Sequence, residues 1–217
     1  MEFNFIFILE ILGTISFAVS GSILAMEKDC DLFGVIVLGC IASIGGGIIR
    51  DLILGIHPPM AFQNPIYAII SIITSLITFL LFYINTESIR KYSKRLDHVD
   101  LLFDSIGLGI FVVVGIDTAI AYFPNNTFLI LFIGLITGVG GGILRDMMAM
   151  KIPMVLRKRI YAIAALIGGI SYYYLQSFFP GTIAIIIGTA ITIIIRLLAA
   201  YYKWNLPRVK LHNSSNH

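Results

Sequence analysis

Two short stretches of this sequence place three adjacent glycines just before an arginine and an aspartate. The first is SIGGGIIRDLILGIHPP at residues 43–59, and the second is GVGGGILRDMMAMKIP at residues 138–153. Glycine destabilises a helix interior by about 1 kcal/mol relative to alanine. A triplet therefore predicts a break in each apolar helix that leaves backbone carbonyl groups uncovered. Such carbonyl groups at membrane depth must face protein or water, where they can act as weak ligands for a passing cation.

The residues expected to line a cation path lie in the triplets, beside them and on neighbouring apolar segments. They are Gly45, Gly46, Gly47, Gly140, Gly141, Gly142, Ser43, Thr137, Thr14, Phe17 and Phe111. Small and hydroxyl residues on one helix face permit a narrow water-filled seam. They equally permit plain close packing of helices, as in small-xxx-small contacts. Both interpretations remain open from the residues alone.

Six charged residues accompany this path inside the apolar runs. They are Glu10, Arg50, Asp51, Asp104, Arg145 and Asp146. Ionisable groups in membrane spans are rare and usually face a partner, the interior of the protein or a water cavity. We expect two ion pairs beside the path, Glu10 with Arg50 and Asp104 with Arg145. The alternative is that each arginine extends to the membrane interface and has a structural role.

The composition indicates which elements position these residues. Of 217 residues, 58% are hydrophobic and 12% are charged, against about 25% charged residues in a soluble domain. This predicts an all-α integral membrane protein with a single transmembrane domain at residues 1–206 and a polar tail at 207–217. Seven apolar runs are each long enough to cross about 30 Å of hydrocarbon. They cover residues 4–25, 32–54, 65–84, 99–121, 126–149, 158–179 and 181–204.

The glycine motif belongs to an internal repeat. GGGIIRD from Gly45 meets GGGILRD from Gly140 at an offset of 95 residues, and IYAI occurs at 66–69 and again at 160–163. The repeat covers spans one to three (about 4–84) and spans four to six (about 99–179). Because three is odd, the second half must enter the membrane from the opposite side. Inverted repeats of this kind are typical of transport folds, with the ligand or ion site near the midplane. The seventh span, 181–204, has no partner.

Basic residues predict the orientation. Twelve of the fifteen Lys and Arg residues fall on one side of the seven-span arrangement, none falls on the other, and three lie within spans. By the positive-inside rule the N-terminus is outside and the C-terminus is cytoplasmic, in a cell membrane. The net charge of +3 follows from this asymmetry and suits contact with anionic membrane lipids, and it requires no nucleic-acid partner.

The sequence contains no constellation that predicts an enzyme. It has no nucleotide-binding glycine loop followed by Lys-Ser/Thr, no paired histidines at metal-ligand spacing and no nucleophile with a base. The two cysteines form neither a C-x-x-C nor a zinc pattern. We therefore expect no cofactor and no bound metal other than the permeant ions.

The doubled motif, the seven spans and the inverted repeat resemble the prokaryotic branch of the trimeric intracellular cation (TRIC) channels. The resemblance implies a homotrimer with one pore inside each protomer, between the first, second, fourth and fifth helices. It also implies permeation of potassium and some sodium, through helices broken at the glycine triplets. The basic gating residue that animal members have on the fourth helix is absent from GLGIFVVVGID at 107–117. Gating of the animal type is therefore not implied.

One alternative function stays open. Inverted repeats and broken helices serve alternating access as well as conduction. A secondary transporter of a small amino acid such as glycine is therefore the second hypothesis, and the sequence does not separate it from a monovalent cation channel.

Overall fold

The computed structural model describes residues 2–84, 93–157 and 160–204. The predicted tail at 207–217 lies outside the described residues. So do six of the basic residues that predict the orientation, which are Arg90, Lys91, Lys158, Arg159, Arg208 and Lys210.

Within the described ranges the regular structure is helical. The first half contains α1 (Glu2–Glu27), α2 (Leu32–Leu54), the short α3 (Met60–Gln63) and α4 (Ile66–Ile84). The second half contains α6 (Ser93–Tyr122), α7 (Thr127–Met148), the short α8 (Met154–Arg157) and α9 (Ile160–Leu175), and α10 (Gly181–Tyr201) follows. Helices α1, α2, α4, α6, α7 and α10 are long and apolar enough to cross a membrane. Helix α9 is a shorter apolar helix of 16 residues. It is therefore shorter than the span predicted at 158–179.

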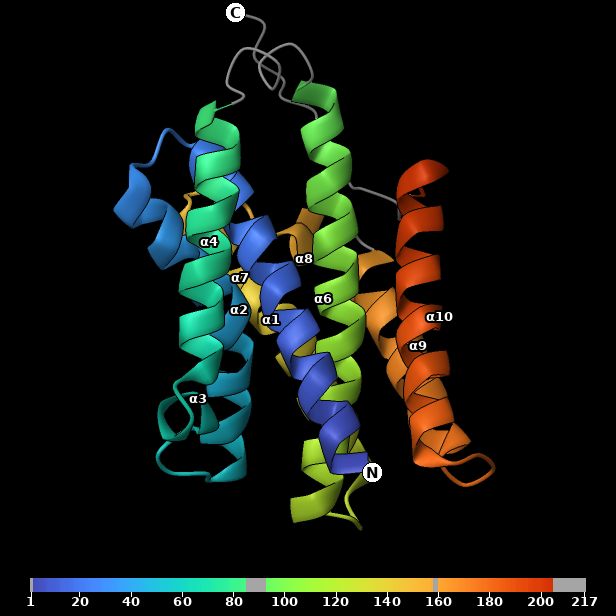
Figure 1. Cartoon of the computed structure of the whole chain (residues 1–217). Coiled ribbons are helices and arrows are strands. Elements are labelled where there is room, and N and C mark those ends of the chain that lie inside the picture. The colour runs from blue at the N-terminus through green and yellow to red at the C-terminus, as the bar shows by residue number, and fades with distance from the viewer. Residues whose placement is uncertain (1, 85–92, 158–159, 205–217) are drawn as a thin grey trace, which may run out of the picture.

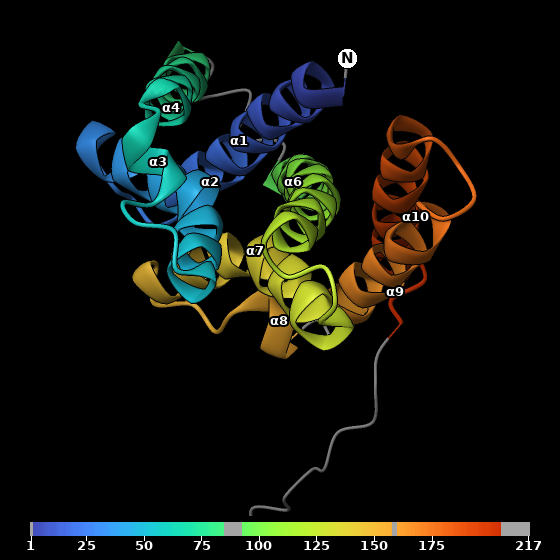
Figure 2. The ribbon, with the colours of Figure 1, turned by 90° about the horizontal axis from the view of Figure 1, so that it is seen from below.

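The two halves have opposite directions in space. Helices α1 and α6, which open the two halves, run antiparallel, and α3 and α8 lie toward opposite ends of the bundle (Figure 1). Helix α10 stands beside α9 at the edge of the second half, and among the described helices none covers α4 in the corresponding way (Figure 2). The predicted inverted repeat of three plus three helices with one appended helix is confirmed.

The centre of the fold is the crossing of α2 and α7. A Cβ atom placed on Gly46 would overlap the carbonyl oxygen of Thr137, and one placed on Gly141 would overlap the carbonyl oxygen of Ala42. These two contacts are equivalent under the repeat, because 42 and 46 correspond to 137 and 141. The helices therefore meet backbone to backbone on the pseudo-two-fold axis, which only glycine permits.

The predicted breaks at the glycine triplets are wrong. Helix α2 is continuous over Leu32–Leu54 and α7 over Thr127–Met148, with both triplets inside them. The tight crossing excludes water from the helix backbone, so the internal hydrogen bonds stay favourable even where three glycines weaken the helix. Close helix packing, the alternative considered above, accounts for the first two glycines of each triplet.

A second symmetric contact joins α1 and α6. Phe17 and Phe111 stack with ring centroids 5.5 Å apart and planes inclined by 17°. Each ring lies over a glycine of the other helix: a Cβ on Gly13 would be 3.0 Å from Phe111, and a Cβ on Gly107 would be 2.6 Å from Phe17. The stacked pair fills the middle of the bundle between the two halves.

Candidate functional site

Two polar clusters occupy equivalent positions of the two repeats. The first cluster consists of Glu10 on α1, Arg50 and Asp51 on α2, and Tyr67 on α4; the second consists of Asp104 on α6, Arg145 and Asp146 on α7, and Tyr161 on α9. In each cluster the acid comes from the first helix of a repeat, the Arg-Asp pair from the second and the tyrosine from the third. The fold thereby brings together all six charged residues predicted from the sequence.

The aspartate of each Arg-Asp pair anchors the loop that follows its helix. Asp51 Oδ1 accepts from Arg50 Nε at 2.8 Å, and its Oδ2 accepts from the backbone N–H of Met60 at 2.7 Å. Asp146 Oδ1 accepts from Arg145 Nη2 at 2.9 Å, and its Oδ2 accepts from the backbone N–H of Met154 at 2.7 Å. These bonds hold the first residues of α3 and α8. Because both carboxylates are occupied and buried, their role in the structure is to fix these loops.

In the first cluster, Glu10 and Arg50 do not form the predicted ion pair, and that prediction is corrected. Arg50 instead binds Asp51 and reaches the sulfur of Met60 at 3.4 Å. The Arg50 guanidinium pairs with Asp51 because Asp51 is the next residue in the chain and its second carboxylate oxygen is held by the backbone N–H of Met60. Glu10 Oε2 accepts from the Tyr67 hydroxyl at 2.5 Å, and among the described residues it has no ion-pair partner.

A small cavity opens at the first cluster, with a volume of about 40 Å³. A single water needs about 10–15 Å³ on this measure, so the cavity admits water or one small ion. Its lining includes Glu10, Thr14, Ser43, Ile44, Gly47, Arg50, Asp51, Met60, Ala61, Tyr67 and Phe111. Ser43 also shares a hydrogen bond of 2.8 Å with Ser71 on α4. The cavity thus places the Glu10 carboxylate, which has no ion-pair partner in the described part of the chain, next to three hydroxyl-bearing residues, Thr14, Ser43 and Tyr67.

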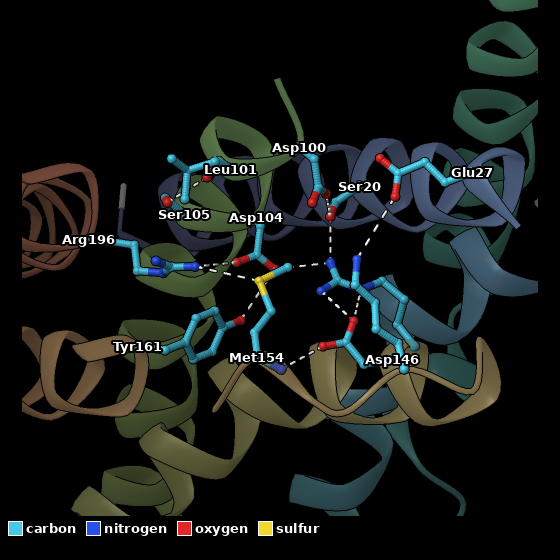
Figure 3. Close-up of polar contacts among 12 residues, drawn as sticks. Ser20, Glu27, Asp100, Leu101, Asp104, Ser105, Asp146, Met154, Tyr161 and Arg196 are labelled. Atoms are coloured by element: carbon cyan, nitrogen blue, oxygen red, sulfur yellow. Dashed lines mark hydrogen bonds and ion pairs between the residues drawn. The ribbon is translucent and has the colours of Figure 1, made fainter. Parts of the chain in front are cut away.

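Ion pairs join the side chains of the second cluster. Arg145 is fully buried and donates to Asp104 Oδ1 at 3.0 Å and to the Ser20 hydroxyl at 2.5 Å. The predicted Asp104–Arg145 pair is therefore formed. Figure 3 shows Asp104 facing both Arg196 of α10 and Tyr161 of α9. Arg196 Nη2 lies 3.5 Å from Asp104 Oδ2, and its guanidinium covers the Tyr161 ring at 4.6 Å from the centroid.

The two clusters differ because a few residues break the repeat. Thr14 and Ser43 line the first cavity, whereas the equivalent positions in the second half are Leu108 and Gly138. Leu108 is fully buried, and the Cβ position of Gly138 lies 2.5 Å from the Val112 side chain. At these two positions the second cluster therefore has neither the hydroxyl group nor the space that the first cluster has.

The remaining predicted residues fall into three places. Gly45, Gly46, Gly140 and Gly141 form the helix crossing. Gly142 faces the second cluster, where its Cβ position lies 3.1 Å from the Tyr161 hydroxyl. Thr137 is buried at the crossing and donates to the Ile133 carbonyl at 2.6 Å, and Phe17 is buried in the aromatic stack.

Several residues of the clusters were not singled out from the sequence. The repeated IYAI indicates the tyrosines, and Arg196 is indicated by being the single charged residue of the segment Gly181–Tyr201. The Ser20 hydroxyl donates a hydrogen bond to Asp100 and accepts one from Arg145. Asp100 had no signal, because it lies near the polar start of its helix.

The fold and the clusters define a multi-pass membrane protein of the inverted-repeat transport class, with ion pairs buried at membrane depth. Comparison with known proteins identifies the family within that class. The family model described as Glycine transporter matches residues 7–83 and, a second time, residues 101–177. The two matches coincide with the two structural repeats.

Curated relatives cover nearly the whole chain. The UPF0126 inner membrane protein YadS of Escherichia coli is 38% identical over 206 residues, which are 94% of this chain and 95% of that protein. The UPF0126 membrane protein YvgT of Bacillus subtilis is 30% identical over 200 residues, which are 92% of this chain and 94% of that protein.

Solved structures agree with the fold. A prokaryotic TRIC channel crystallised in 0.5 M KCl is 34% identical, with a TM-score of 0.84 over 94% of this chain and 100% of that one. The TRIC orthologue from Rhodobacter sphaeroides is 29% identical, with a TM-score of 0.82 over 93% of this chain and 100% of that one. The chain therefore belongs to the family described as Glycine transporter, and to its prokaryotic TRIC channels. It is a multi-pass membrane protein and not an enzyme.

Proposed function

We propose that this protein is a cation channel that conducts potassium through a path inside each protomer. The observation that carries the proposal is the carboxylate of Glu10, which faces a polar cavity and has a tyrosine hydroxyl as its hydrogen-bond partner. A carboxylate without an ion pair keeps its attraction for a passing cation, while the Thr14 and Ser43 hydroxyl groups supply neutral oxygen ligands. The solved TRIC cation channels with the same fold support this function.

The proposed path runs from the first cluster past the helix crossing to the second cluster. The Phe17–Phe111 stack separates the two clusters in the middle of the bundle. At the second cluster, Arg145 is buried against Asp104, so a cation that follows this path would meet its positive charge. This arrangement is the closed state of the path, and conduction requires Arg145 to move away from the Asp104 side chain.

The assembly is proposed as a homotrimer in a cell membrane, with membrane lipids around it, the N-terminus outside and the C-terminus cytoplasmic. The exposed apolar side chains of α4, which include Ile69, Ile73 and Ile77, suit lipid or a neighbouring protomer. The bounds of the transmembrane domain, 1–206, and of the polar tail, 207–217, stay predictions from the sequence.

Cysteine labelling tests the orientation. Asn64 precedes α4 and Lys28 follows α1, and both residues are exposed. In a background with Cys30 and Cys40 replaced by serine, Asn64→Cys is expected to react with an impermeant maleimide from outside intact cells. Lys28→Cys is expected to react after the membrane is permeabilised. Reaction of both cysteines from the same side contradicts the inverted topology.

Recording in planar bilayers tests conduction. In a potassium chloride gradient the purified protein is expected to give unitary currents that reverse near the potassium potential. Glu10→Gln removes the charge facing the cavity, and we expect a potassium conductance about tenfold lower, equivalent to about 1.4 kcal/mol. Glu27→Gln is the matched control, because Glu27 pairs with Lys151 at 3.9 Å at a partly exposed position. Currents that reverse at the chloride potential contradict the proposal.

A second candidate function follows from the same cavity. Its lining contains the Arg50 guanidinium as well as the Glu10 carboxylate, so opposite charges are available for the two ends of a small zwitterion. The family description names glycine transport. Saturable exchange of labelled glycine by proteoliposomes, without unitary currents, favours the transporter; currents that are unchanged by glycine favour the channel.

A further inference from the structure

A larger cavity lies beside the second cluster, between the end of α10 and the start of α9, and Tyr161 belongs to both. Its volume is about 260 Å³, and it is lined by Ile160, Tyr161, Arg196, Ala199, Ala200, Lys203 and Trp204. This lining contains two cations and no carboxylate. It also contains an apolar wall formed by the isoleucine and the two alanines. The cavity therefore suits a ligand with an anionic head and a hydrocarbon part.

Arg196 supplies a buried donor to this cavity. Its side chain is 2% exposed, and its Nε atom is buried without a hydrogen-bond partner in the described part of the chain. The other side of the guanidinium is occupied, since Nη2 lies near Asp104 Oδ2 and 3.7 Å from the Met154 sulfur. A buried donor without a partner costs about 1–3 kcal/mol, and an oxyanion in the cavity removes that cost.

The cavity lies at the depth of a membrane interface. Tyr201, Tyr202 and Trp204 follow one another at the end of α10, with ring centroids 5.0 Å apart for the first pair and 5.9 Å for the second. Aromatic residues gather at the level of lipid headgroups. Under the orientation proposed above, this end faces the cytoplasmic leaflet, where anionic lipids and basic residues attract each other.

We propose that this cavity binds the phosphate headgroup of an anionic phospholipid. Arg196 Nε and the Lys203 ammonium group hold the phosphate oxygens, and the first part of an acyl chain lies along Ile160 and Ala199. Guanidinium groups suit phosphate because their planar donors match its oxygens. Free inorganic phosphate shares the headgroup chemistry but leaves the apolar wall uncovered. Lipid binding at this site can be measured directly, so the proposal can be tested without recording currents.

Native mass spectrometry of the purified full-length protein tests the proposal. Phosphatidylglycerol is expected to remain bound at detergent concentrations that remove phosphatidylcholine with the same acyl chains. Lys203→Gln is expected to weaken phosphatidylglycerol binding about fivefold, which corresponds to the loss of one basic residue near an anionic surface. Lys28→Gln is the matched control, because Lys28 is exposed and does not line this cavity; it is expected to bind phosphatidylglycerol like the unchanged protein.

Three outcomes overturn the proposal. Equal retention of the two lipids shows that the headgroup charge is not recognised. Unchanged binding by Lys203→Gln places the lipid elsewhere. Inorganic phosphate that displaces no lipid yet raises the melting temperature as much as phosphatidylglycerol does assigns the cavity to a free anion. Arg196→Lys keeps the charge near Asp104 but loses Nε, and it is expected to reduce phosphatidylglycerol binding while the protein still melts cooperatively.

Discussion

Replacing Gly46 by alanine is expected to reduce the yield of folded protein strongly. The added methyl group would overlap the carbonyl oxygen of Thr137 on α7. That oxygen belongs to the backbone of a continuous helix, so it cannot move away as a side chain would. Separating α2 from α7 also loosens the symmetric contact between Gly141 and Ala42. We expect the yield of monodisperse protein on size exclusion to fall at least about tenfold, with a melting temperature lower by several degrees or more.

Gly47→Ala is the matched control for this substitution. The nearest atom that its Cβ would meet is Arg50 Nη2, at 3.9 Å, which is ordinary van der Waals contact. This variant is therefore expected to fold like the unchanged protein, even though alanine replaces the very next glycine. Similar losses for both variants would show that the triplet matters as a flexible segment rather than as a close helix contact.

Much of the fold is predictable because the internal repeat can be recognised directly from matching sequence motifs. The identity of GGGIIRD with GGGILRD in six of seven positions, together with the odd number of spans in each half, fixes the inverted topology. Composition and run length then locate the helices. The Asp104–Arg145 pair is predictable for a simpler reason, since both residues are costly to bury alone in a membrane.

The effect of the triplets is not predictable from local properties. Glycine both weakens a helix and permits close approach, and which effect dominates depends on what lies opposite. For Gly46 that neighbour is a carbonyl group 91 positions further along the chain. Only the packed structure shows that the space left by the missing side chain is filled by another backbone.

The partner of Arg50 is unpredictable for a similar reason. Glu10 and Asp51 are both within reach of a guanidinium group in a helical bundle. The choice depends on the Met60 N–H, which fixes the Asp51 carboxylate from the other side. The loop between α2 and α3 determines that position, and its geometry has no hydropathy signal.

Changing the symmetric acids Glu10 and Asp104 separates conduction from stability. Asp104→Asn removes a carboxylate that accepts from Arg145 at 3.0 Å and lies 3.5 Å from Arg196. Two buried guanidinium groups then lose a counter-charge, and breaking a buried pair costs about 3–5 kcal/mol. Glu10→Gln keeps an amide oxygen that can accept from Tyr67, removes the charge that strengthens this hydrogen bond and breaks no ion pair within the described ranges, so its cost is about 1 kcal/mol.

Denaturant titrations of the two variants, followed by circular dichroism in the same detergent, check this difference. We expect Asp104→Asn to lose a large part of its unfolding free energy, whereas Glu10→Gln stays close to the unchanged protein and loses potassium conductance instead. Tyr161→Phe provides a smaller change at the same cluster, since its hydroxyl is 3.4 Å from Asp104. Equal destabilisation by Glu10→Gln and Asp104→Asn would mean that the two clusters are equivalent. The cavity at Glu10 would then be a structural feature of the first repeat, and the open polar site on which conduction depends would have to lie elsewhere.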